Sequence, residues 1–306
     1  MKVSITGIGK VGASIGFTLT LFEACDELVL VSRDPALAEA EALDLQHAAS
    51  LGPGRMSIRA GGLPETAGSD VVVICNSVPS GPGDVTTRLE LAEANWALFG
   101  DLVPQLYEQS PEAVFLVVSN PVDVLTYRAL KLTGADPRRV LGTGTLIDSA
   151  RYRWAIAQET GVRPADIRAY VLGEHGDSQF PAISNASIGG ERADSPDSQW
   201  KLFREAAQSA YQVRSARGFT NYAIARAAGL LVHCIGKDTG HTMPVTTCID
   251  GPYGVKDVCL SLPCVVGRGG ISRVLRPDLS DEEAEAFRRS AQVVRQAIDA
   301  CASSTT

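Results

Sequence analysis

The apolar residues in the first half of the chain form short continuous runs, separated by stretches with helical periodicity. The runs KVSITG, ELVLVS, SDVVVICN and EAVFLVVSN are rich in β-branched residues and do not alternate with polar ones, which is typical of strands buried on both faces. Between them, residues 10–22, 35–49 and 88–109 repeat apolar side chains at helical spacing. This succession of strands and helices predicts a parallel, doubly wound sheet.

The pattern changes after RVLGTG, near residue 142. From there we expect a helix from about Thr145 to Gln158, a long helical region from Trp200 to Ile235, two antiparallel strands around MPVTTCI and VCLSLPCVV, and an amphipathic helix from Asp281 to Cys301. The fold class is therefore predicted to be α/β. A Rossmann-type dinucleotide-binding domain at residues 1–142 is followed by a mixed α/β catalytic domain at residues 143–306.

The composition and net charge of the chain limit the kinds of molecule that it can be expected to bind. The 45% hydrophobic and 21% charged residues are ordinary for a globular protein, and the net charge of −7 with a pI near 5.2 argues against nucleic acid or an anionic membrane surface. No apolar run approaches the ~20 residues that span a bilayer, and MKVSITGIG lacks the features of a secretion leader, so we expect a cytoplasmic protein. The seven cysteines form no CxxC pair, which predicts small buried side chains and no metal site.

A glycine loop follows the first predicted strand. TGIGKVG places Gly7, Gly9 and Gly12 in GxGxxG spacing between a strand and a helix. The glycines allow a tight turn, a close approach of the backbone to a diphosphate and close helix–strand packing, while the N–H groups that open the helix attract the negative charge. We therefore predict a dinucleotide site that includes Lys10 and Val11. Flavin-binding domains share this signal, so the loop alone leaves the dinucleotide open.

Four further motifs carry a family resemblance. GTGTLIDSARYR is followed by LGEHGDS, whose histidine lies 24 residues after Arg151, while SNPVDV and DLQHA occupy residues 119–124 and 44–48. Over essentially its whole length the chain resembles the lactate/malate dehydrogenase family, and LGEHGDSQF and RGFTNYAIA lean to its lactate/2-hydroxyisocaproate branch.

The resemblance implies a reversible hydride transfer between a nicotinamide cofactor and an L-2-hydroxy monocarboxylic acid, as in an L-lactate dehydrogenase. Three alternatives remain open: a malate dehydrogenase, a non-catalytic dinucleotide-binding regulator, and the NAD-dependent glycosidase chemistry of a related scaffold. A regulator has no need to keep the proton-transfer and carboxylate-binding residues together. The glycosidase would need metal ligands, and no cysteine–histidine cluster is visible.

The candidate catalytic residues are a histidine, an aspartate and an arginine. Reduction of a 2-keto acid needs a proton donor, which His175 in LGEHGDSQF can be because imidazole changes charge near neutral pH. Asp148 and Arg151 are three apart on a predicted helix, so Asp148 can orient the imidazolium while Arg151 offers a planar fork to the substrate carboxylate. Without the histidine, the alternative is an ordinary surface ion pair. The remaining histidines are predicted to be structural or solvated: His47, His233 and His241.

Four more positions are assigned to the substrate by resemblance. Arg88 follows the loop SGPGDVTT and would polarise the reacting carbonyl, and Asn120 in SNPVD would bind the nicotinamide ribose or the substrate. The alternatives are a solvated arginine and a turn residue. Malate enzymes carry a second arginine in the loop, whereas this chain has Ser80 or Gly81 there and no cation in SVPSGPGDVTT, which predicts monocarboxylic substrates over oxaloacetate. Thr220 in RGFTNYAIA is also assigned to the substrate site.

The end of the second strand bears on the choice between NAD and NADP. NAD-specific relatives place an acid there to bind the adenosine ribose, but LVLVSRDP places Ser32 at that position and Arg33 next. Serine and arginine can bind a 2′-phosphate, so we expect NADP to be accepted alongside NAD. Asp34 could return a carboxylate to the ribose; its simpler interpretation is a turn residue before Pro35.

Two arginines bear on assembly. Arg153 lies two residues after the substrate arginine and Arg168 seven before the histidine. In allosteric bacterial lactate dehydrogenases, basic residues at these offsets bind fructose bisphosphate across a subunit interface. We therefore hypothesise a homo-oligomer, a dimer or a tetramer, with a polyanion site; the alternative is two unrelated surface arginines.

Overall fold

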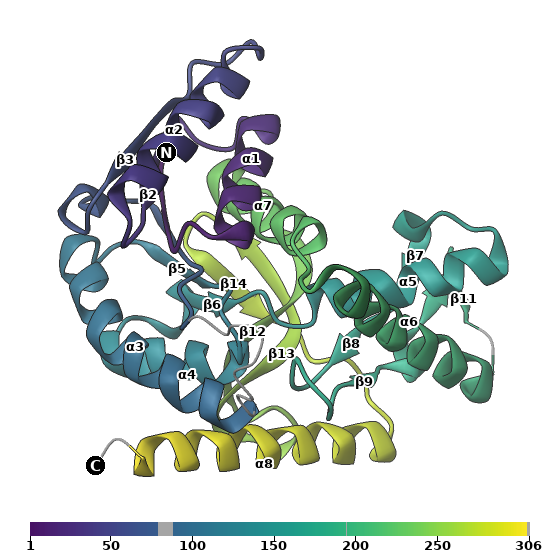
Figure 1. The fold of residues 1–306 in the computed structure, drawn as a ribbon. Coiled ribbons are helices and arrows are strands. Elements are labelled where there is room, and N and C mark those ends of the chain that lie inside the picture. The colour runs from purple at the N-terminus through teal and green to yellow at the C-terminus, as the bar shows by residue number, and fades with distance from the viewer. Residues whose placement is uncertain (79–87, 194, 305–306) are drawn as a thin grey trace.

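One large sheet forms the centre of the molecule. The computed structural model describes residues 1–78, 88–193 and 195–304 (Figure 1). Its nine-stranded sheet has the order β14-β13-β12-β6-β5-β4-β1-β2-β3. The parallel strands are β1 (Lys2–Thr6), β2 (Glu27–Val31), β3 (Ser57–Gly61), β4 (Val71–Ile74), β5 (Val114–Val117) and β6 (Val140–Gly142).

Antiparallel strands extend the same sheet beyond β6. They are β12 (His241–Asp250), β13 (Lys256–Gly267) and β14 (Gly270–Val274). The junction is the antiparallel pairing of Thr246 in β12 with Gly142 in β6. The sheet therefore runs on past residue 142, and the division into two domains at that residue stays a prediction.

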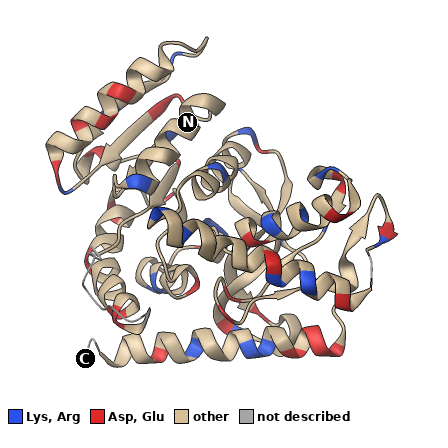
Figure 2. Ribbon diagram, turned by 45° about the vertical axis from the view of Figure 1, so that its right-hand side comes forward, with Lys and Arg blue, Asp and Glu red and all other residues tan. Residues whose placement is uncertain are grey.

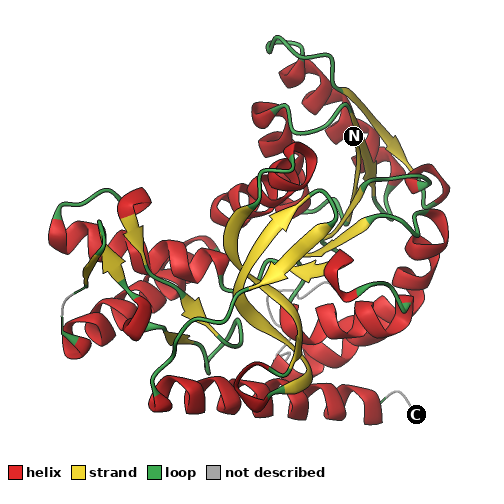
Figure 3. Ribbon diagram, turned by 180° about the vertical axis from the view of Figure 1, so that it is seen from behind, coloured by secondary structure: helices red, strands yellow, loops and turns green. Residues whose placement is uncertain are grey.

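Helices cover both faces of the parallel strands (Figures 1 and 3). The helices are α1 (Lys10–Phe22), α2 (Pro35–Ala49), α3 (Arg88–Gln109), α4 (Val122–Thr133), α5 (Leu146–Thr160), α6 (Pro196–Arg217), α7 (Tyr222–Lys237) and α8 (Asp281–Ser303). Val71 and Val73 of β4 pack in one apolar cluster with α1, α2 and α7, whereas Val72 and Ile74 pack in another with α3 and α4. Burial on both faces explains why the strands are continuous apolar runs in the sequence.

The C-terminal helix closes the molecule below the sheet. α8 packs on β13 and on α3 and α4, and the apolar side chains that it buries include Phe287, Val294 and Ile298. Its first turn carries the acids Asp281, Glu282 and Glu283, visible as a red end in Figure 2, where they complement the positive end of the helix dipole. Across the described ranges, no helix combines the length and apolar character that a bilayer crossing needs.

Short strands complete the part of the chain between α5 and α6. They are β7 (Ile167–Arg168), β8 (Val171–Leu172), β9 (Phe180–Pro181), β10 (Ser187–Ile188) and β11 (Glu191–Arg192). The pair β8 and β9 is joined by residues 173–179, the stretch that carries the histidine. All seven cysteines are free and none is exposed, in keeping with small buried side chains.

The architecture confirms the predicted α/β fold with a doubly wound parallel sheet. Several elements escaped prediction, among them the strands β3 and β14 and the helix α4. The edge strand β3, SIRAG, is short and mixes polar with apolar residues; β14, GISRV, has the same character. Helix α4 has twelve residues, and its buried positions include the polar Asp123 and Thr126, so burial does not follow the apolar pattern alone.

The expected helical region from Trp200 to Ile235 is in fact two helices. Gly218 has a φ of 76° and closes α6 in the left-handed conformation, donating its N–H to the Arg214 carbonyl. This glycine cap ends α6, and α7 starts at Tyr222. Because the residues on both sides of Gly218 have helical periodicity, the sequence pattern did not reveal that α6 and α7 are separate helices.

Candidate active site at the carboxyl edge of the sheet

The histidine loop is fastened to the sheet at its first residue. Gly173 donates its N–H to the Ser261 carbonyl over 3.2 Å and accepts from the Ser261 N–H over 2.9 Å, which ties the loop to β13. Leu172 pairs with Phe180 across β8 and β9. Glu174 accepts hydrogen bonds from the N–H and the hydroxyl of Ser178 and so closes the loop from within. The loop is thus an ordered hairpin rather than a solvated turn.

Within this loop His175 meets Asp148. The His175 Nδ1 lies 2.7 Å from the Asp148 Oδ2, and an Arg151 guanidinium nitrogen donates to the Asp148 Oδ1 over 3.1 Å. The side chain of Asp148 is only 8% exposed, whereas those of Arg151 and His175 are 22% and 28% exposed. The acid is therefore buried and its two partners are partly accessible. Because Nδ1 faces the carboxylate, Nε2 is the ring nitrogen left for proton exchange.

The environment favours the charged forms of both partners. Burial lowers the pKa of the His175 imidazole, but the charge of Asp148, its hydrogen bond and the charge of Asp123 outweigh burial, so that this pKa lies above its usual value. Burial raises the pKa of Asp148, but the charge and hydrogen bond of His175 and the charge of Arg151 bring it below its ordinary value. Both shifts favour the form of the pair in which an imidazolium lies beside a carboxylate.

The position of α5 sets this geometry. The Thr145 N–H at its N-terminus donates to the Ser261 hydroxyl over 3.0 Å, and the Thr145 hydroxyl donates to the Val171 carbonyl. Helix α5 is thereby fixed to both β13 and β8 before it presents Asp148 and Arg151 from one face. Close to these two side chains, a small cleft is lined by Gln179, Phe203, Ala206 and Ala207.

A second acid below the histidine was not predicted. Asp123 is 2% exposed and accepts the His175 N–H on Oδ2 over 2.7 Å and the Thr246 hydroxyl on Oδ1 over 2.6 Å. Burial raises its pKa to about 6, although both hydrogen bonds act to lower it. The motif SNPVDV contains Asp123, and the sequence signal was an acid within a stretch that is otherwise mostly apolar.

The glycine loop offers a cradle that side chains would fill. Gly7 has a φ of 86°, and a Cβ there would lie 2.7 Å from the Asn76 nitrogen, while a Cβ on Gly12 would lie 2.4 Å from the Gly7 carbonyl oxygen. A Cβ on Gly9 would meet nothing within 4 Å, so the middle of the loop is open. This open backbone at the N-terminus of α1 fits a dinucleotide diphosphate, as predicted from GxGxxG spacing.

The sequence matches one family along nearly its whole length. Residues 1–142 match the description "lactate/malate dehydrogenase, NAD binding domain", and residues 145–305 match "lactate/malate dehydrogenase, alpha/beta C-terminal domain". The chain belongs to the lactate/malate dehydrogenase family. The predicted family is confirmed, and so is the assignment to its lactate branch.

Relatives of known name agree. The L-lactate dehydrogenase of Synechococcus sp. is 40% identical, covering 98% of this chain and 99% of the relative. That of Gloeobacter violaceus is 38% identical over 98% of this chain and 93% of the relative. A solved lactate dehydrogenase, MGS-M5 from a Medee basin deep-sea metagenome library, superposes with a TM-score of 0.93 at 32% identity and covers 98% of both chains.

The remaining predicted residues of this dehydrogenase family member lie in different places. Asn120 follows β5; its carbonyl accepts from the Asn95 side chain over 2.8 Å and its Oδ1 accepts from the Val122 N–H over 3.3 Å. Thr220 lies half-buried between α6 and α7, and in the described part of the chain no hydrogen bond joins it to the histidine site. Arg88 begins α3, but its side chain and the whole of Ser80 lie outside the described residues.

The other predicted cofactor residues follow the first two strands, β1 and β2. Lys10 and Val11 open α1, where the Lys10 ammonium lies 3.9 Å from the centre of the Phe219 ring. After β2, the Ser32 hydroxyl accepts from the Asp34 N–H over 3.1 Å, and Arg33 is exposed. Across the described residues, no group of histidine, cysteine and acidic side chains is arranged to hold a metal ion.

Proposed function

We propose that this protein is an L-lactate dehydrogenase-like oxidoreductase that interconverts an L-2-hydroxy monocarboxylic acid and its 2-keto acid at the His175 site. The observation that carries the proposal is the contact of His175 with Asp148, and of Asp148 with Arg151, on a chain whose family binds NAD. When bound, NAD supplies the hydride acceptor and NADH the hydride donor.

The proposed reaction assigns one task to each side chain. Arg151 uses its guanidinium nitrogens to hold the substrate carboxylate and thereby orients the adjacent carbonyl. As hydride reaches the carbonyl carbon, the His175 imidazolium gives a proton to the carbonyl oxygen, forming the hydroxyl group. In the opposite direction neutral His175 accepts that proton. Asp148 stabilises the charged ring and keeps Nδ1 turned away from the substrate.

The cofactor would lie along the carboxyl edge of the sheet. Gly7, Gly9 and Gly12 would face the diphosphate, and Asn120 after β5 would face the nicotinamide ribose or the substrate. A regulator without chemistry has no physical need for a buried Asp148 that favours the charged form of a histidine. The enzyme therefore explains the site better than a binding module does.

Pyruvate and 2-ketoisocaproate are expected to be reduced with a kcat/KM at least about tenfold above that of oxaloacetate. The segment 79–87, PSGPGDVTT, has no cation and contains Asp84, so a second substrate carboxylate would be desolvated without a partner, at a cost above ~1.4 kcal/mol. Initial rates followed by NADH absorbance test this, and Ser80→Arg should raise the oxaloacetate rate. A preference for oxaloacetate would point to a malate dehydrogenase instead.

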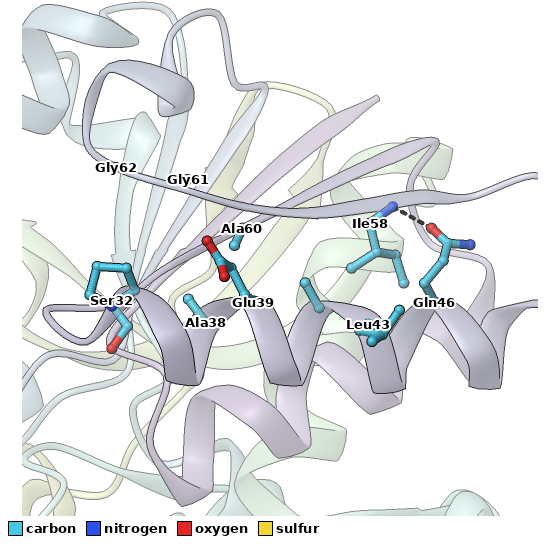
Figure 4. A pocket seen from close by; sticks show the side chains of 11 residues that line it. Ser32, Ala38, Glu39, Leu43, Gln46, Ile58, Ala60, Gly61 and Gly62 are labelled. Atoms are coloured by element: carbon cyan, nitrogen blue, oxygen red, sulfur yellow. Dashed lines mark hydrogen bonds between the residues drawn. The ribbon is translucent and has the colours of Figure 1, made fainter.

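NADP acceptance is a further part of the proposal, supported by how the end of β2 is arranged. The side chain of Asp34 caps the N-terminus of α2. Its Oδ1 accepts the Ala36 N–H over 3.1 Å and the Leu37 N–H over 3.3 Å. An acid held in this way is turned to its own helix. Ser32 lines one end of a cavity of about 530 Å³ between α2 and β3 (Figure 4), and Arg33 is free to approach from solvent.

NADPH is therefore expected to support pyruvate reduction with a kcat/KM at least comparable to that of NADH. Arg33 can pair with a 2′-phosphate, whereas Ser32→Asp should repel that phosphate, bind the ribose hydroxyls and shift the preference towards NADH by about tenfold or more. Cofactor titrations at fixed pyruvate measure both. The matched control is Ser32→Ala, which removes the hydroxyl without adding charge. A wild-type preference for NADH of about a hundredfold would refute the proposal.

We further propose a homo-oligomer with an anion site between its subunits. Arg153 donates to the carbonyl of Ala169, the residue after Arg168, over 3.4 Å, which places the two arginines near each other. Burial lowers the pKa of Arg153 most strongly, and the charge of Arg168 acts in the same direction. Large apolar side chains stand exposed near them and elsewhere, among them Trp154 at 54% and Tyr222 at 71%. A second copy would cover such residues, and a polyanion would compensate the two arginines.

A further inference from the structure

Asp123 is the most deeply buried acid near the site, and the reaction as described makes no use of it. It lies in the first turn of α4, where the positive end of the helix favours a negative charge. Its two oxygens receive hydrogen bonds from elements remote in sequence: the His175 N–H from the histidine loop and the Thr246 hydroxyl from β12. A structural role alone would be filled equally well by an uncharged side chain, since burying a carboxylate is costly.

The contacts of Asp123 continue into a polar anchor, which we define as Asp123, Thr246 and Ser261. Thr246 and Ser261 face each other across β12 and β13, with their hydroxyls 3.5 Å apart. Ser261 holds Gly173, two residues before the histidine, and its hydroxyl accepts the Thr145 N–H at the start of α5. The anchor therefore holds both halves of the proton-transfer pair.

We propose that Asp123 is a positioning residue for His175: it fixes the backbone from which the imidazole projects and adds a second negative charge beside the imidazolium. This inference rests on the proposed function. The hydrogen bond from the His175 N–H to Asp123 fixes the backbone of His175 to α4, and the hydrogen bond from the Thr145 N–H to Ser261 fixes the start of α5, which carries Asp148. The charge acts on the ring through buried surroundings, where screening by solvent is weak.

Several charged groups face the imidazole and must be weighed with Asp123. Helix α5 contributes the carboxylate of Asp148, which favours the charged ring, and the guanidinium of Arg151, which opposes it. Glu174 on the loop raises the pKa of Asp123, as burial does more strongly. From β13, Cys259 is a thiol whose pKa burial holds well above its ordinary value, so it brings no charge near neutral pH. Asp123 and Asp148 thus act in the same direction on His175.

Asp123→Asn is the sharpest test because it removes the charge and keeps the shape. The Asn amide oxygen can still accept the His175 N–H, and its NH₂ group can donate to the Thr246 hydroxyl, which can rotate. The fold should persist, and thermal unfolding checks this. Asp257→Asn is the matched control, because Asp257 is an exposed acid that pairs with Lys131 and Arg295 away from the histidine.

The first readout is the pKa of His175 in the enzyme without substrate, measured by NMR titration of the imidazole. The chain has four histidines, so the signal can be assigned from the spectrum of His175→Gln. We expect Asp123→Asn to lower this pKa by about half a unit or more and Asp257→Asn to leave it in place. Thr246→Val removes one hydrogen bond to the carboxylate, which favours the protonated acid and should lower the pKa of His175 in the same direction.

The second readout is the pH profile of kcat/KM for pyruvate reduction. Reduction needs the charged imidazole, so the fall of activity at high pH should move to lower pH by the same amount in Asp123→Asn. An unchanged pKa of His175 in a folded Asp123→Asn protein would overturn the inference. If the wild type reduced no 2-keto acid but the NMR shift appeared, the proposed function would fail and the positioning role would stand.

Discussion

Replacing His175 with asparagine is expected to lower the kcat for pyruvate reduction by about 10³-fold while NADH still binds within a few-fold of its normal affinity. The asparagine side chain can keep a hydrogen bond to Asp148, whose Oδ2 lies 2.7 Å from the His175 Nδ1, but it carries no proton that it can release near neutral pH. NADH binding should persist because the open glycine loop follows β1, far from the histidine loop in sequence and in a different element.

Stopped-flow turnover and a fluorescence titration with NADH separate these two effects. His241→Asn serves as the control, because His241 is exposed at the start of β12 and should leave both quantities unchanged. Should the His175→Asn enzyme keep near-normal turnover, the proton would have to come from elsewhere and the assignment of the site would be wrong. A loss of NADH binding equal to the loss of turnover would instead indicate a disturbed fold.

Asp148→Asn is expected to lower kcat/KM for pyruvate by about 10²-fold or more and to move its pH profile. The charge and hydrogen bond of Asp148 hold the pKa of the His175 imidazole above its ordinary value, against the effect of burial. Without that charge the imidazole loses its proton at lower pH. Because reduction needs the protonated ring, the fall of activity with rising pH should begin at lower pH than in the wild type. For oxidation of the hydroxy acid, which needs the neutral ring, the rise of activity should also move to lower pH.

Steady-state rates across pH in both directions measure this shift. Glu285→Gln is a matched control: Glu285 pairs with Arg288 at the same i,i+3 spacing as Asp148 with Arg151, but both its side chain and that of Arg288 are largely exposed. Neutralising that surface pair should change neither rate nor profile. A pH profile that stays in place in Asp148→Asn would contradict the role given to this carboxylate.

Much of the site was predictable because local chemistry limits it. GxGxxG after an apolar run predicts an open loop before a helix, and the structure has Gly7, Gly9 and Gly12 there, with the middle position open. The spacing of Asp148 and Arg151 predicts one helix face, and an Arg151 guanidinium nitrogen indeed lies 3.1 Å from the Asp148 Oδ1. The glycine loop and the Asp148–Arg151 pair each depend on residues close together in the chain, which is why both could be predicted from the sequence.

Other features depended on residues that the chain brings together over long distances. Asp123 and His175 are 52 residues apart and Asp123 and Thr246 are 123 apart, so no window of sequence contains the polar anchor. The edge strand β3 has too few apolar residues to stand out, and the buried positions of α4 include the polar Asp123 and Thr126. These features are determined by the segments that pack against them in the folded protein, and not by their own residues alone.

The sequence by itself determined the class of fold, the dinucleotide loop and the residue types of the proton-transfer site, because apolar periodicity and short motifs act over one or two turns of chain. The tertiary structure alone decided that the histidine loop is held on β13 through Gly173 and Ser261, and that a second buried acid supports the His175 backbone. Asp34 follows the same rule: its role as the α2 cap became visible only in three dimensions. Hydrogen bonds between distant segments require the sheet to be assembled first, since the sheet is what brings those segments within 3 Å of each other.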